Sequence, residues 1–311
     1  MSDHSEPAKS DIETERVSSG NGGAPAPRRS GKSAATAALG AQLPAQFAAS
    51  FKKVDKALAL EDPVRMVHEA RKAIKQYRAL LRLVGTAQAD AARRTAAATA
   101  RELSSARDRQ ARRDAIAALV AHKALPSTDG QALLEALGLT SDPSSAQADH
   151  AARLRAWLGD ARAQHADELD RQAVGSDVLK QLRRAYRKAR DADRFSHAED
   201  LHELRKRVVT HRYQMSFLAN VAQGTATKRA QRAQALRDLL GLMQDIETLG
   251  ASLASAPSLS DGLRRKAEAA SRKVQKEIVA QVRDSHRSLF RRPAKSFGRR
   301  LAARLAGQVH I

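Results

Sequence analysis

The sequence predicts an all-α protein. Its 311 residues are rich in alanine, leucine and arginine, which favour helix, and aromatic residues make up only 3% of the chain. Apolar residues recur at helical spacing through most of the sequence, whereas no segment alternates apolar and polar residues as a half-buried strand would. Glycines follow several of these apolar patterns at positions typical of helix ends, namely Gly85, Gly175, Gly224 and Gly250.

The helices can be assigned in chain order. Residues 1–38 are polar, rich in Gly, Ser and Pro, and without apolar period, which predicts a disordered tail. Helical periodicity begins near Leu43 and continues to about Leu60. Asp62 as N-cap and Pro63 at the first helical position predict a second helix, which ends at Gly85. The same reasoning predicts helices over 89–123, 129–138, 146–173, 176–192, 199–222, 227–250, 260–288 and 293–307.

One sequence motif occurs twice, beginning at His68 and at His202. Both copies carry Glu directly after the His, Arg three residues after it, Lys four residues after it and Arg ten residues after it. On a helix, residues at these offsets lie along one face. The motifs therefore predict two cationic stripes. The first consists of His68, Arg71, Lys72, Lys75, Arg78 and Arg82, and the second of His202, Arg205, Lys206 and Arg212.

Apolar residues occupy the opposite face of each motif helix, so each helix is expected to pack on one side and to be cationic on the other. In the first copy these core candidates are Ala70, Ala73, Ile74, Tyr77, Leu80, Leu81 and Val84. In the second copy they are Leu204, Val208, His211, Met215 and Leu218.

The repeated motif indicates an internal duplication. Each motif helix is followed by another helix with an Asp near its middle, Asp108 in the first case and Asp245 in the second. We expect an N-terminal half over 39–145 and a C-terminal half over 146–307, forming two antiparallel helical bundles related by a pseudo-two-fold. The two stripes would then face each other. Each Asp is expected to orient an Arg of its stripe or to set helix register, not to act in catalysis.

The charge balance predicts an anionic partner. Lys and Arg outnumber Asp and Glu by 55 to 34, a net charge of +21, and this surplus favours nucleic acid, an anionic membrane or polymeric phosphate. The stripes hold almost no acid, so their charges repel one another unless a ligand neutralises them. Arg and Lys together suit repeating phosphates along a line. A solvated helix surface is the alternative for each stripe, and a merely structural role is the alternative for each His.

A further basic helix precedes the second motif. Arg183, Arg187 and Arg190 share one face of it and are expected to widen the slot between the stripes, with a solvated role as the alternative. Glu199 lies three residues before His202, the spacing of di-iron bundles, but Arg65 takes that place before His68, so no metal site is expected. The sequence has no phosphate-cradling glycine loop, nucleophile elbow or zinc signature. These features predict a binding protein without a cofactor, not an enzyme.

The sequence also bears on the compartment. It contains no cysteine, which fits a reducing environment. No apolar run approaches the roughly 18 residues that a membrane-spanning helix needs, and the N-terminus lacks the apolar core of a secretory signal. A cytoplasmic location is therefore expected.

From about residue 40 to 307 the chain resembles the CHAD family (conserved histidine α-helical domain). The resemblance lies in the paired motifs, the Asp-bearing helices, Tyr186-Arg187-Lys188-x-Arg190 and Phe290-x-x-Pro293. It implies two pseudo-symmetric bundles around a basic central channel, binding of inorganic polyphosphate without known catalysis, and association with polyphosphate or storage granules. The ligands it implies are His68, Arg71, Lys72, Lys75, Arg78, His202, Arg205, Lys206 and Arg212. The family usually has Lys or Arg seven residues after the second His, where this chain has Val209.

Three other functions were weighed against polyphosphate binding. The low aromatic content leaves little on which a nucleic-acid binder could stack bases. A granule-coating scaffold, whose Ala-rich helices dock on another surface, stays open. An enzyme acting on polyphosphate is disfavoured because the sequence offers no clustered carboxylates to hold Mg²⁺.

Overall fold

The computed structural model describes residues 30–103, 105–140, 148–221 and 224–306, and within these ranges the chain forms helices and no strands. The predicted all-α class is therefore confirmed. The helices are α1 (Ser30–Leu58), α2 (Pro63–Val84), α3 (Ala87–Glu102), α4 (Ser105–Ala121), α5 (Ser127–Ala136), α6 (Ala148–Gln164), the π-helical turn η1 (His165–Leu169), α7 (Asp170–Val174), α8 (Val178–Arg190), α9 (Ala198–Val221), α10 (Thr225–Ser255), α11 (Asp261–Leu289) and α12 (Ala294–Ala306).

Several helix boundaries differ from the sequence prediction; α10, for example, continues past Gly250, its predicted end, to Ser255. Helix α1 already begins at Ser30 and continues through Pro44, so the tail predicted to reach residue 38 ends earlier; residues 1–29 lie outside the described ranges. The single helix predicted over 89–123 is two helices. Leu103 leaves helical geometry at the end of α3, and its N–H bonds back to the Thr99 carbonyl at 3.3 Å, which closes the helix.

The first motif helix, α2, has the ends that its sequence predicts. The Asp62 carboxylate accepts hydrogen bonds from the backbone N–H groups of Val64 (2.8 Å) and Arg65 (3.3 Å), and Pro63 is the first helical residue. Gly85 ends the helix in the left-handed region at φ +76°. A Cβ atom at Gly85 would lie 2.2 Å from the side-chain nitrogen of Gln181, so this glycine also allows α8 to approach.

The predicted core faces of the motif helices are confirmed. All the apolar residues named above for α2 and α9 are buried, as is His211. Helix α2 packs against α1 and α3, and α9 packs against α8 and α10.

Each motif helix also belongs to a buried aromatic cluster that contains a histidine. Around α2, the rings of Phe47, Phe51 and Tyr77 contact His165, whose Nε2 lies 3.0 Å from the Tyr77 hydroxyl, and Trp157 packs against Tyr77. Around α9, His211 contacts the rings of Tyr186, Phe290 and Phe297. The two clusters form the centres of two helical bundles.

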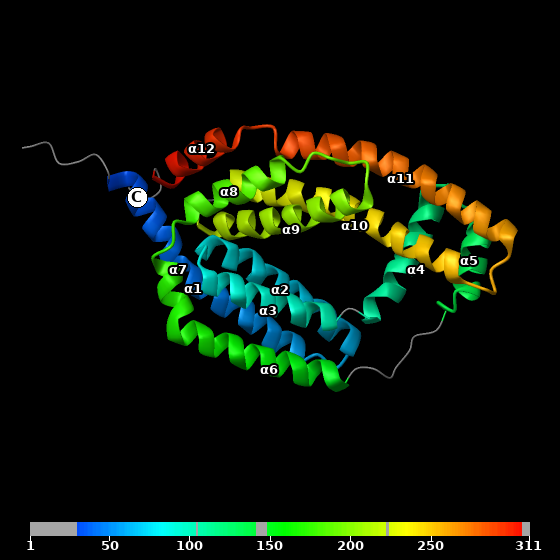
Figure 1. Cartoon of the computed structure of the whole chain (residues 1–311), viewed down its shortest axis with the longest axis horizontal. Helices are drawn as coiled ribbons and strands as arrows, with labels where there is room; N and C mark the ends of the chain where they lie inside the picture. Colours follow the sequence, from blue (N-terminus) through cyan, green and yellow to red (C-terminus); the bar gives the residue numbers. More distant parts are fainter. Residues whose placement is uncertain (1–29, 104, 141–147, 222–223, 307–311) are drawn as a thin grey trace, which may run out of the picture.

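Helices α6 and α7, which the sequence analysis assigned to the C-terminal half, pack against α1, and α6 also packs against α3 (Figure 1). Helix α8 packs against α9 and α12, and α10 packs against α9 and α11. The division into two halves between residues 145 and 146 stays a prediction.

Helix α4 departs from the helices that precede it. It leaves α3, packs against α10 and α11 of the second bundle, and carries α5 with it (Figure 1). Arg109 and Arg113 of α4 donate to the carbonyls of Gly138 (2.6 Å) and Leu139 (2.7 Å), which hold the segment after α5 in place. The first segment of the chain thus contributes two helices to the packing of the second.

Buried histidines predict a loss of stability in mild acid. Burial, followed by the charge on Arg229, lowers the pKa of His211 well below its usual value. A histidine whose folded-state pKa is depressed stabilises the fold above its unfolded pKa of about 6.5, and this stability is lost as the pH falls below that value. We expect His211→Leu to reduce the loss of unfolding free energy between pH 6.5 and 5.5 by about 1 kcal/mol, because the unfolded histidine is only partly protonated in this window. Urea denaturation at several pH values measures this.

The matched control is His197→Gln, which removes an exposed histidine. It should leave the pH dependence as in the parent chain. If His211→Leu unfolds with the same pH dependence as the parent, protonation of His211 does not control acid stability.

Candidate functional site

The two motif helices lie against each other. The hydroxyl of Tyr213 on α9 donates to the Lys72 carbonyl of α2 at 3.2 Å, and the side-chain amide of Gln214 donates to the Ala79 carbonyl at 3.2 Å. Gln214 is fully buried, so its hydrogen bond lies inside the contact. The fold therefore brings the two copies of the motif, far apart in sequence, onto neighbouring helices (Figure 1).

The two copies have the same local geometry. Lys72 pairs with Glu69 at 3.3 Å, and Lys206 pairs with Glu203 at 3.4 Å. The arginine before each lysine reaches the following long helix of its own bundle. Arg71 donates to the Ala100 carbonyl of α3 at 2.6 Å, and Arg205 donates to the Gln244 side chain of α10. The repeated sequence is thus repeated in side-chain contacts, and the two arginines also tie helices together.

We use the name motif face for the two stripes of α2 and α9 taken together. Its exposed members include His68 and Lys72 on α2, with side chains 72% and 55% exposed, and Lys206 on α9, 57% exposed. Arg82 and His202 are exposed as well. The other members are half-buried and lie at the base of the stripes: Arg71, Lys75, Arg78, Arg205 and Arg212. A ligand can reach charges of both helices from solvent.

Helix α3 adds cations that the sequence analysis did not identify. Burial and then the charges of Arg82, Arg93 and Arg101 lower the pKa of Arg78. Arg93 and Arg101 lie about two turns apart on α3. Their spacing was visible in the sequence, but nothing in the sequence indicated that α3 lies beside the end of the α2 stripe.

Charges of the two motif helices act on one another at the Arg82 end of the stripe. Partial desolvation and the nearby Arg93 lower the pKa of Arg82, and Glu203 and Arg207 of α9 also act on it. Glu203 opposes the shift and Arg207 adds to it. Arg82 therefore lies where the two motif copies meet.

His202 is the titratable member of the second stripe. Partial burial, followed by the charges of Lys206 and Arg205, lowers its pKa, while Glu203 and a hydrogen bond with Gln244 oppose the shift. Without a ligand the imidazole is thus held toward its neutral form. An anion on this surface would reverse that balance by favouring the charged form.

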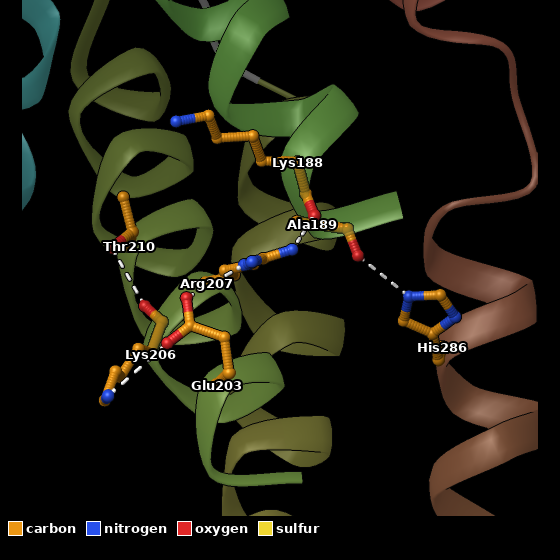
Figure 2. A network of polar contacts seen from close by, with 7 residues as sticks. All are labelled: Lys188, Ala189, Glu203, Lys206, Arg207, Thr210 and His286. Atoms are coloured by element: carbon orange, nitrogen blue, oxygen red, sulfur yellow. Dashed lines mark hydrogen bonds and ion pairs between the residues drawn. The ribbon is translucent and has the colours of Figure 1, made fainter. Parts of the chain in front are cut away.

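Figure 2 shows how Glu203 and the residues near it connect α9 to α8. Arg207 donates to the Glu203 carboxylate at 3.1 Å and to the Lys188 carbonyl at 2.7 Å. The next carbonyl, that of Ala189, accepts from His286 of α11 at 2.9 Å. Two carbonyls of the last turn of α8 are thus satisfied by side chains from two other helices. Arg207 therefore has a structural role at this position, where it connects α9 to α8.

The contacts of two of the three α8 arginines lie toward α11 and α12. Arg183, Arg187 and Arg190 each follow a buried residue of α8 by one position, a rotation of about 100°. The side chain of Arg183 packs beside Gly298 of α12, and Arg190 pairs with Asp191 at 3.7 Å. Arg183 and Arg190 line cavities bounded by α12 and by α11 respectively, and Arg187 is exposed. The expectation that these residues widen the slot therefore has no contact in its favour.

The carboxylates give the following picture. Asp245 is half-buried on α10, next to the Gln244 that binds Arg205, whereas the side chain of Asp108 lies outside the described part of the structure. Among the residues that the structure describes, no group of three or more His, Asp or Glu side chains could hold a metal ion.

No described helix is long and apolar enough to cross a membrane.

Comparison with known proteins agrees with the motif and its helices. The family model described as CHAD domain matches residues 41–254, which include both motif helices and the long helix after each. No curated protein and no solved structure matches the chain. Because the family match covers more than half of the sequence, the chain belongs to the CHAD domain family.

Proposed function

We propose that the motif face binds inorganic polyphosphate and that this binding is non-catalytic. The observation that carries the proposal is the direct packing of α2 against α9, which places two copies of one cationic motif side by side. A linear ligand with one charge per repeating unit can contact both stripes at once. The family supports this ligand, and the equivalent contacts of the two copies support a pseudo-two-fold between them.

The chemistry of the motif face suits phosphate. Lysine offers a compact charge and arginine a planar fork, and both bind phosphate oxygens. Each motif contains only one acid, Glu69 or Glu203, and it pairs within its own helix. Each motif therefore carries more positive than negative charge, and repulsion among Arg78, Arg82, Arg93 and Arg101 would be relieved when the ligand binds.

Nucleic acid is the second candidate, and the aromatic residues argue against it. All Phe, Tyr and Trp side chains are buried except Phe195, which is half-buried. Proteins that bind single strands present exposed aromatic rings on which bases stack. The motif face offers charge without such rings, which favours a polymer that has phosphates and no bases.

Removing exposed charges from both stripes should weaken binding without unfolding the protein. We expect Lys72→Ala, Arg82→Ala and Lys206→Ala together to reduce affinity for long-chain polyphosphate by at least tenfold at low salt. By analogy with nucleic acids, the slope of log affinity against log salt should also fall by about 0.7 to 0.9 per lost contact. Titrations at several salt concentrations measure both effects.

The control for this triple variant removes three exposed cations from α6 and α11, with Arg155→Ala, Arg265→Ala and Lys273→Ala. It has the same net charge as the test variant. Equal loss of affinity in the two variants would mean that overall charge, and not the motif face, captures polyphosphate.

Competition between long-chain polyphosphate and single-stranded DNA at equal phosphate concentration shows which of the two ligands the protein prefers. Incubation with Mg²⁺ should release no phosphate.

Binding should tighten as the solution becomes more acidic. The lowered pKa of His202 means that the free protein takes up this proton only below about pH 6.5, whereas bound phosphate raises the pKa. Affinity should therefore rise as the pH falls from about 8 toward 6. The double variant His68→Gln, His202→Gln should bind with a flatter pH profile while binding at pH 8 changes little. Identical profiles for parent and variant would exclude a direct role of the imidazoles.

In cells that store polyphosphate, we expect the binding to direct the chain to polyphosphate or storage granules. A fluorescently tagged chain should form foci that disappear in cells unable to make polyphosphate, because the ligand is then missing. The triple variant should be diffuse in both strains. Foci that persist without polyphosphate would instead favour a scaffold that docks on a granule surface.

A further inference from the structure

A second cationic surface lies apart from the motif face, at the end of the second bundle where α10 begins and α11 ends. A cavity of about 650 Å³ opens there, a size typical of small-molecule sites. We call it the C-terminal groove. Its cations are Lys228, Arg229, Arg232, Arg287, Arg291 and Arg292.

The charge of the C-terminal groove is not compensated by the protein. Asp284 is the acidic residue of its lining, against six cations. Within the described residues, none of these six takes part in an ion pair. This differs from the motif face, where Lys72 and Lys206 each pair with a glutamate. Such an excess around one cavity is costly unless a counter-ion occupies it.

Arg229 forms the inner wall of the groove and is held rigidly. Its guanidinium lies over the rings of Tyr186 (5.3 Å) and Phe297 (5.1 Å), and Nη2 donates to the Leu289 carbonyl at 2.8 Å. Its Nε is buried and has no hydrogen-bond partner in the protein. Arg229 is thus a fixed positive charge beside five further cations of the groove.

A neighbouring cavity is less suited to an anion. It has a volume of about 970 Å³ and shares Arg287 and Arg291 with the C-terminal groove, but its lining also includes Asp191, Asp193 and Asp200. These three carboxylates offset much of the positive charge. The groove between α10 and α11 is therefore the more specific anion site.

The C-terminal groove is also distinct from the centre of the motif face. Gln244, which binds Arg205, lies twelve residues after Arg232 on α10, about 18 Å along the helix. Arg287, Arg291 and Arg292 lie outside residues 41–254, the range of the family match. The groove is thus built partly from the segment that follows the matched range.

We propose that the C-terminal groove is a second anion site, which binds a compact oligophosphate of two or three phosphate groups. The limited volume of the open cavity and the convergence of cations from two helices and the α11–α12 connection suit a short, highly charged ligand. A long polymer would instead need an extended surface. This site goes beyond the proposed binding of long-chain polyphosphate by the motif face and does not depend on it.

Tripolyphosphate is the probe that tests the groove. In calorimetric titration of the full chain, Arg232→Gln, Arg287→Gln and Arg291→Gln together should lower its affinity at least tenfold, because three exposed cations of the groove are lost. Thermal unfolding should stay cooperative, since none of the three is in an ion pair. The control variant Arg155→Gln, Arg265→Gln, Lys273→Gln should bind tripolyphosphate like the parent.

The motif-face variant Lys72→Ala, Arg82→Ala, Lys206→Ala separates the two proposals. It should keep one equivalent of tripolyphosphate while losing long-chain polyphosphate, and the groove variant should show the reverse. If the groove variant binds tripolyphosphate as tightly as the parent, the second site is overturned and the motif face is unaffected. If tripolyphosphate binding is lost only when the motif face is changed, the groove is likewise not its site.

Discussion

The structure depends on packing two helices of like charge against each other. Helices α2 and α9 meet through buried apolar faces and through the hydrogen bonds of Tyr213 and Gln214 to the α2 backbone. The cationic stripes border this contact, so their repulsion must be offset by burial in both bundles. Glu69 and Glu203 reduce the repulsion in their own helices, and Arg71 and Arg205 are restrained by the next helices. What remains is a concentration of positive charge that the fold maintains in the absence of a ligand.

Much of this could be predicted from the sequence because the signals are local. Asp62, Pro63 and Gly85 specify the ends of α2 through backbone chemistry that needs no tertiary contact. Helical spacing alone predicts a cationic face and an apolar face on each motif helix. The burial of Ile74 on α2 and of Leu204 on α9 confirms that the apolar faces point into the core. The repeated motif also predicted that the two stripes face each other; α2 and α9 do pack together, and the facing of the stripes stays a prediction.

The sequence is less informative where the answer depends on a neighbouring helix. The spacing of Arg183 and Arg190 defines a face of α8 but not which helix covers that face, and α11 and α12 lie there. Arg93 and Arg101 joined the site only because α3 lies beside α2. The break at Leu103 has no glycine or proline to signal it, so α3 and α4 were assigned as one helix. After the second motif helix, α9, the chain continues in the single helix α10, whereas after the first motif helix, α2, it continues in the two helices α3 and α4.

That break has a consequence for how the molecule can be divided. Helix α4 turns away at Leu103 and joins α10 and α11. The segment that contains the first motif therefore does not pack as one separate group of helices. A fragment ending before α8 would expose the side of α4 that α10 now covers, and a fragment beginning at α8 would leave α10 bare along the same contact. Helices on both sides of the α7–α8 connection therefore share one hydrophobic interior, and neither fragment is expected to be an autonomous folding unit.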